Sequence, residues 1–161
     1  METQMTGTDN IASAKAEAMP LPAKWLGATG AVPFVATAII AAFGPENWSA
    51  WAAHALAYYG AVILSFLGGI HWGLAISDSG TAKISAARLC WSVVPSLIAW
   101  GALLLPLFYG LMVLTAAFGL ALFVDTRAGT RAVVPSWFPD LRTALSIAVI
   151  ASLPLGLIGA A

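Results

Sequence analysis

The sequence predicts an all-α integral membrane protein, a bundle of five transmembrane helices. Of its 161 residues, 60% are hydrophobic and 9% are charged, whereas soluble domains carry about 25% charged residues. The mean hydropathy is +0.89, and the apolar residues fall into long runs separated by short polar or proline-containing segments. Seven basic and seven acidic residues cannot cover a compact body in water. We therefore expect lipid to surround most of the chain.

Five spans are expected, because a helix needs about 20 apolar residues to cross the hydrocarbon core of a bilayer. From Leu89 to Val124 the chain has no charged residue, and a single helix of that length would measure about 54 Å. This run must therefore fold into two helices, and Pro106 is suited to the start of the second one. The expected spans are 25–43, 51–76, 88–105, 107–124 and 141–160.

The segment before the first span, residues 1–22, is polar, contains Pro20 and Pro22, and lacks the pattern of a secretory signal. We expect it to be a mobile cytoplasmic tail, followed by a transmembrane domain at 23–161. With the N-terminus in the cytoplasm, every basic residue lies on the cytoplasmic side, as short loops generally require. These residues are Lys15, Lys24, Lys83, Arg88, Arg127, Arg131 and Arg142. An odd number of spans then places the C-terminus in the periplasm.

Aromatic residues near the ends of the spans agree with this orientation, because Trp and Tyr collect at membrane interfaces. The residues expected toward the outer interface are Trp48, Trp51, Tyr58, Tyr59, Trp100 and Tyr109. Those expected toward the inner interface are Trp25, Trp72, Trp91 and Trp137.

His71 is the ionisable residue that lies well within a span. At helical spacing it shares a face with small or apolar residues and one acid, namely Gly60, Leu64, Gly68, Ala75 and Asp78, and Gly69 and Gly73 form a further small-residue pair. Small residues allow helices to approach closely in lipid, so we expect His71 to point into the bundle. Two interpretations follow: a structural histidine bonded to a neighbouring helix, or a residue that contacts a ligand, carries a proton or binds a metal.

The sequence gives no indication of a metal, a haem or another cofactor. His54 precedes His71 by about 25 Å of helix, and the single cysteine, Cys90, has no companion for a disulfide or a metal site. No motif pairs a nucleophile or a metal with an activating group, so we expect no enzyme activity. Zero net charge also disfavours nucleic acid as a partner.

Charged residues are expected at the cytoplasmic ends of the spans and not in their interiors: Asp78, Arg88, Asp125, Arg127, Asp140 and Arg142. One interpretation is mutual ion pairing of half-hydrated groups that fixes the loops. The other is that they line, together with His71, an inward-facing polar pocket or a docking surface. Pumps and coupled transporters usually carry charges inside the membrane, so a coupled transporter is disfavoured.

Several strings of the sequence resemble a known family. They include Phe-Leu-Gly-Gly-Ile-His-Trp-Gly at 66–73, Trp-Ser-Val-Val-Pro at 91–95, Asp125, Pro-Ser-Trp-Phe at 135–138 and Leu-Arg at 141–142. The chain resembles the bacterial domain-of-unknown-function family 3429, which is similar to the transmembrane protein 69 type of eukaryotic mitochondria. The resemblance implies a small multi-pass protein of the bacterial inner membrane. It implies no reaction, and it singles out His71, Asp125, Trp137 and Arg142.

Together these observations favour a non-enzymatic accessory, assembly or interaction protein, with the lipid bilayer and other inner-membrane proteins as its partners. Two alternatives stay open: binding of a small apolar or tetrapyrrole-like ligand in a pocket near His71, and conduction of protons or small solutes. The candidate functional residues are His71, Trp72, Asp78, Arg88, Asp125, Trp137 and Arg142. The oligomeric state is left open.

Overall fold

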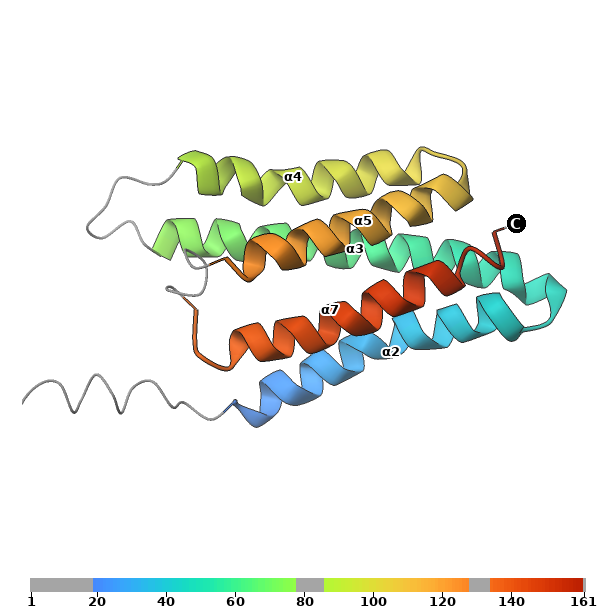
Figure 1. The fold of residues 1–161 in the computed structure, drawn as a ribbon, viewed down its shortest axis with the longest axis horizontal. Helices are drawn as coiled ribbons and strands as arrows, with labels where there is room; N and C mark the ends of the chain where they lie inside the picture. Colours follow the sequence, from blue (N-terminus) through green and yellow to red (C-terminus); the bar gives the residue numbers. More distant parts are fainter. Residues whose placement is uncertain (1–18, 78–85, 128–133, 161) are drawn as a thin grey trace, which may run out of the picture.

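The computed structural model describes residues 19–77, 86–127 and 134–160, and every regular element in these ranges is an α-helix (Figure 1). The helices are α2 (Leu21–Phe43), α3 (Glu46–Ser77), α4 (Ala86–Leu103), α5 (Leu107–Asp125) and α7 (Phe138–Leu155). All five are long and apolar enough to cross a membrane. The prediction of an all-α integral membrane protein with five spans is confirmed.

The two short connections between helices follow from their sequences. The Gly44 N–H donates to the carbonyl of Ile40 over 2.9 Å and closes α2, and α3 then starts with Glu46, whose negative charge suits a helix N-terminus. Pro106 directly precedes α5, with φ −51° and ψ 139°. The predicted fold of the long apolar run at Pro106 is therefore confirmed.

Several helix ends differ from those expected. α2 starts at Leu21, inside the segment expected to be a tail, because a proline is tolerated in the first turn of a helix; residues 1–18 of that tail lie outside the described residues. α7 spans Phe138–Leu155, not 141–160. It ends beside Pro154, after which Leu157 N–H donates to the Pro154 carbonyl in a tighter turn, at 3.1 Å.

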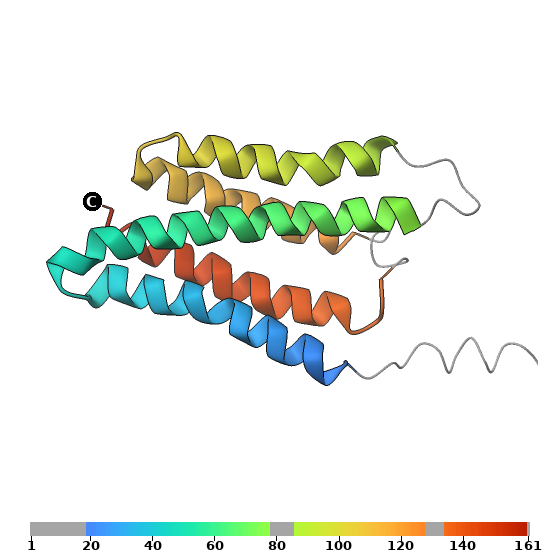
Figure 2. The same cartoon turned by 180° about the vertical axis from the view of Figure 1, so that it is seen from behind.

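The bundle is organised around α3, which contacts each of the other four helices. Figures 1 and 2 show α4 on one side of α3 and α2 on the other. α2 and α3 are close where they connect and diverge toward the end at which α2 begins. The largest fully buried side chains form the core: Phe34, Phe118, Leu56, Leu64, Leu111, Leu114 and Leu153.

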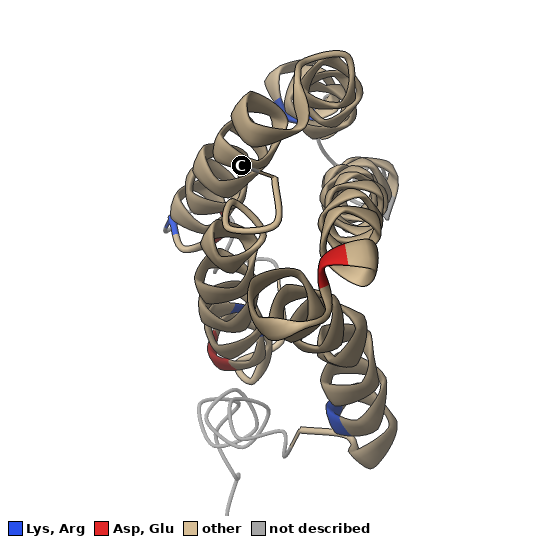
Figure 3. Cartoon of the chain, turned by 90° about the vertical axis from the view of Figure 1, so that its right-hand side faces the viewer, with Lys and Arg blue, Asp and Glu red and all other residues tan. Residues whose placement is uncertain are grey.

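Most apolar side chains point outward from the bundle. In the most apolar window of each span, only 17% to 39% of the residues are buried, so the outer surface is suited to lipid and not to water. Charged residues are sparse in the described part of the chain (Figure 3). Lys24 near the start of α2, Arg88 near the start of α4, Arg127 after α5 and Arg142 near the start of α7 belong to the same end of the bundle.

Tyr59, which the sequence predicted toward the outer interface, is half-buried in the bundle. Its hydroxyl donates to the Gly30 carbonyl over 2.9 Å, and its ring lies 4.9 Å from that of Phe34. Pro33 lacks the N–H that would continue the hydrogen bonds of α2. The carbonyl left without this partner is that of Thr29, so the Tyr59 hydroxyl bonds to the carbonyl next to it.

The small-residue faces of α3 have different environments. The face shared with His71 is buried, as predicted, and at Gly68 an added methyl group would collide with the Ser92 carbonyl of α4. Gly69 and Gly73, in contrast, are exposed and have open space beside them. Among the described residues, nothing lies within 4 Å of a methyl group added at either position.

Candidate functional site

Three ionisable side chains that are far apart in the sequence meet inside the bundle. His71 of α3 donates from Nε2 to Asp125 Oδ1 over 2.7 Å, since a carboxylate oxygen can only accept. Arg142 of α7 donates from Nε to Asp125 Oδ2 over 2.6 Å. The three residues are 6% to 8% exposed. Asp125, the last residue of α5, therefore joins three helices through one buried carboxylate.

Further polar and aromatic contacts hold this His–Asp–Arg cluster. Arg142 Nη1 donates to the hydroxyl of Ser146 over 2.5 Å, and Ser146 is fully buried one turn further along α7. The ring of Trp91 in α4 meets the His71 ring edge to face, with 6.5 Å between centroids. Arg142 Nη2 is buried and has no hydrogen-bond partner among the described residues.

The Asp125 carboxylate lies at a helix end that does not favour it, because the C-terminus of a helix carries partial negative charge. Arg142 lies in the second turn of α7, beyond the turn in which the helix N-terminus acts most strongly. The two charges stabilise each other, and His71 donates a further hydrogen bond to the Asp125 carboxylate. A buried pair of this kind is costly to break, because removal of one partner leaves the other charge unpaired.

The other candidate residues are placed at the surface or near the helix ends. Trp72 is 48% exposed, Arg88 is half-buried near the start of α4, and Asp78 lies outside the described residues. Trp137 is half-buried, with its ring 6.2 Å from that of Phe138. The structure thus brings together His71, Asp125 and Arg142 from the predicted set.

The expected half-hydrated ion pairs at the loop edges need correction. Asp125 and Arg142 do pair, but they do so inside the bundle, because α7 starts at Phe138 and carries Arg142 into its second turn. Arg127 is instead exposed, with its guanidinium 4.2 Å from the centre of the Phe123 ring, and Asp140 is exposed at the start of α7.

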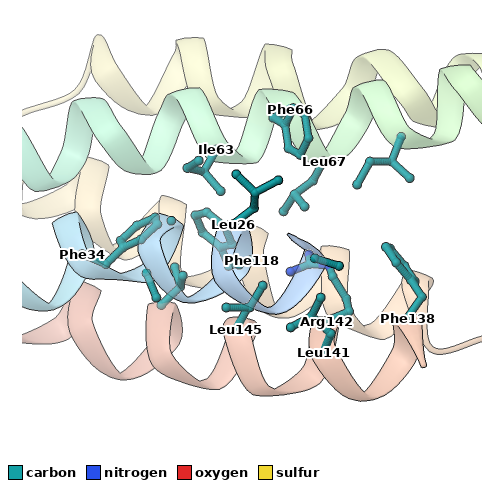
Figure 4. A pocket seen from close by; sticks show the side chains of 16 residues that line it. Leu26, Phe34, Ile63, Phe66, Leu67, Phe118, Phe138, Leu141, Arg142 and Leu145 are labelled. Carbon is teal, nitrogen blue, oxygen red and sulfur yellow. The ribbon is translucent and has the colours of Figure 1, made fainter. Parts of the chain in front are cut away.

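A pocket of about 420 Å³ lies beside the cluster, between α2, α3, α5 and α7 (Figure 4). Among the described residues, its lining is apolar apart from one charged residue, Arg142. The lining residues are Ala23, Leu26, Gly27, Gly30, Ala31, Phe34, Ile63, Phe66, Leu67, Ile70, Phe118, Phe138, Leu141, Arg142, Leu145 and Val149. Leu26 and Phe66 are 73% and 66% exposed, so the pocket reaches the outer surface of the bundle. It is not the polar pocket that the sequence suggested, because His71 and Asp125 bond to each other and do not line it.

Sequence reasoning did not identify Ser146 and Trp91 as members of the site. The contact of Ser146 could have been predicted from its spacing, because it lies four residues after Arg142 and side chains at that spacing meet on a helix. No sequence pattern indicated the contact of Trp91 with His71, since it arises from the packing of α4 on α3. Within the described ranges, no group of three or more His, Cys, Asp or Glu residues could hold a metal ion.

Comparisons with known proteins place the chain in a family. A profile described as "Protein of unknown function (DUF3429)" matches residues 19–158. Transmembrane protein 69 of Xenopus tropicalis is 37% identical over 140 residues, which cover 83% of this chain and 53% of that protein. Transmembrane protein 69 of Mus musculus is 30% identical over 139 residues, covering 86% and 56%.

The chain thus spans about half the length of these relatives. No solved structure matches it significantly. The profile covers the five helices and all three members of the buried cluster. The chain therefore belongs to the DUF3429 family of transmembrane proteins, whose function is unknown.

Proposed function

We propose that this chain is a non-enzymatic membrane protein that binds a small apolar molecule in the pocket between α2, α3, α5 and α7. The observation that carries the proposal is the pocket itself, whose volume of about 420 Å³ lies within the roughly 300–1,000 Å³ of typical ligand sites. Its apolar lining and its exposed rim, at Leu26 and Phe66, suit a molecule that enters from the membrane.

The residues around the pocket support a binding site, because they leave space inside it and because contacts between helices fix its walls. Gly30 leaves open space along α2. The buried carboxylate of Asp125 holds α3, α5 and α7 together. A tetrapyrrole coordinated by His71 Nε2 has less support, because that nitrogen already donates to Asp125.

Photolabelling tests this proposal. The chain is placed in lipid nanodiscs with a long-chain hydrocarbon that carries a diazirine, and labelled residues are mapped by mass spectrometry. Gly30 lines the pocket and has open space beside it, so Gly30→Leu should fill the pocket and reduce labelling of Phe34 and Leu145 several-fold. Gly101→Leu is the matched control, because Gly101 also has open space but lies outside the pocket. Equal labelling of both variants would refute the proposal.

A role as an accessory or assembly protein is the second candidate. The open positions of Gly69 and Gly73 on α3 favour it, because a small-residue pair facing lipid can receive a helix of another protein. Purification in mild detergent should then yield a co-purifying membrane protein that Gly69→Leu releases. A chain that runs only as a free monomer would count against this role.

Conduction of protons or solutes has weaker support. The polar cluster lies near one end of the bundle, while the described core beyond it consists of fully buried apolar side chains such as Leu56, Leu64, Leu111 and Leu114. A flux assay in liposomes tests conduction directly.

We also propose that the chain lies in the inner membrane of a bacterium with its N-terminus in the cytoplasm. The basic residues support this orientation, since Lys24, Arg88, Arg127 and Arg142 belong to one end of the bundle and positive charges collect on the cytoplasmic side. Alkaline phosphatase fused to the C-terminus should be active, and fused green fluorescent protein should be dark. The reverse result would overturn the orientation.

A further inference from the structure

We propose that the molecule bound in the pocket is a neutral amphiphile whose carbonyl oxygen accepts a hydrogen bond from Arg142 Nη2. This inference rests on the proposed binding function and specifies the chemical class of the ligand. It follows from the donors left over on Arg142, from the charge balance of the cluster, and from the shape of the pocket.

The donors of Arg142 are only partly used. The guanidinium has five N–H groups, of which Nε donates to Asp125 and Nη1 to Ser146. Nη2 is buried without a partner in the described parts of the chain, although buried polar groups are nearly always hydrogen-bonded. The same side chain is the one charged group among the described residues that line the pocket (Figure 4). An acceptor brought by a ligand would satisfy this nitrogen.

The charge balance selects a neutral acceptor. The positive charge of Arg142 is already paired with the Asp125 carboxylate at 2.6 Å, and His71 occupies the other oxygen of that carboxylate. The Arg142 guanidinium and the Asp125 carboxylate therefore balance each other. A ligand anion would add an uncompensated negative charge in a low-dielectric site, which is costly, whereas a ketone, ester or quinone oxygen adds none.

The shape of the pocket sets the orientation of the ligand. Arg142 and Val149 both line the pocket and are seven residues apart in α7, which corresponds to about 10 Å along the helix. The wall beyond Arg142 is apolar up to Phe34 and Val149. The carbonyl end therefore lies at Arg142 and the hydrocarbon end near Val149. Because Nη2 is itself buried, the carbonyl must displace apolar wall side chains to reach it.

Three chain-matched diazirine probes test the inference: a hydrocarbon, a methyl ester and an ionised carboxylic acid. In nanodiscs, the ester should label the pocket at a concentration at least about tenfold lower than the hydrocarbon or the acid, as one added hydrogen bond to a charged donor implies. A diazirine next to the carbonyl should label Leu141 or Ile70, and one at the far end of the chain should label Phe34 or Val149. This mapping uses the unaltered chain and does not depend on the folding of any variant.

The variant Arg142→Lys keeps a positive charge for Asp125 but removes Nη2. It should lose the preference for the ester while the hydrocarbon still labels the pocket. Equal labelling by ester and hydrocarbon, a preference for the acid, or an ester preference that survives in Arg142→Lys would overturn the inference and leave the binding function standing. Absence of pocket labelling by all three probes would overturn both.

Discussion

Replacement of Asp125 by Asn tests whether the buried carboxylate holds the bundle together. The carboxylate accepts from His71 at 2.7 Å and from Arg142 at 2.6 Å, and all three residues are less than 9% exposed. An asparagine of the same shape offers one acceptor oxygen and turns an NH₂ group toward the other donor. It also leaves Arg142 with an unbalanced buried charge. Breaking a buried pair in this way costs about 3–5 kcal/mol.

For a chain of this length, each kcal/mol shifts the melting temperature by about 2–4 °C. Asp125→Asn should therefore lower the melting temperature by roughly 6–20 °C, measured by tryptophan fluorescence in mild detergent. The control is Asp140→Asn, because Asp140 is exposed at the start of α7 and its loss should cost only about 0.3–1 kcal/mol of helix-dipole energy. If both variants melt within about 3 °C of the unaltered chain, the carboxylate does not hold the helices.

Two further substitutions test packing in the membrane. Gly68→Ala should destabilise the bundle by about 1–3 kcal/mol, because the methyl group collides with the Ser92 carbonyl. Its control is Gly69→Ala, which has open space beside it and should be neutral or slightly stabilising. Thermal unfolding of the two variants measures the difference. Tyr59→Phe removes the hydrogen bond to the Gly30 carbonyl and should lower stability by about 0.5–2 kcal/mol; an unchanged melting temperature would contradict a role for this bond beside Pro33.

The number and approximate position of the helices could be predicted because the bilayer sets their length. A charge-free run too long for one span must fold, and Pro106 is where it does so. The exact ends of the helices were harder to predict from the sequence. α2 includes residues assigned to the tail and α7 stops at Leu155, since a proline can begin a helix or end one and the composition alone does not distinguish the two cases.

The candidate site was only partly predictable for a different reason. His71, Asp125 and Arg142 were each identified, but their contacts join positions 54 and 17 residues apart, and no local pattern specifies such a meeting. Charges near the ends of spans were expected to stay half-hydrated, whereas the extra turn at the start of α7 carries Arg142 into the bundle. The pocket had no sequence signal, because it results from the divergence of α2 from α3.

The placement of the two charges separates a purely structural role from a binding role. If the pair served only to fasten α5 to α7, a cation would suit the end of α5 better than the Asp125 carboxylate does, because the C-terminus of a helix carries partial negative charge. The observed arrangement instead puts the guanidinium in the pocket wall. The swapped variant, Asp125→Arg with Arg142→Asp, should therefore recover much of the stability that Asp125→Arg alone loses. It should nevertheless lose the preference for a carbonyl-bearing probe, and a swapped variant that keeps this preference would show that Arg142 does not recognise the ligand.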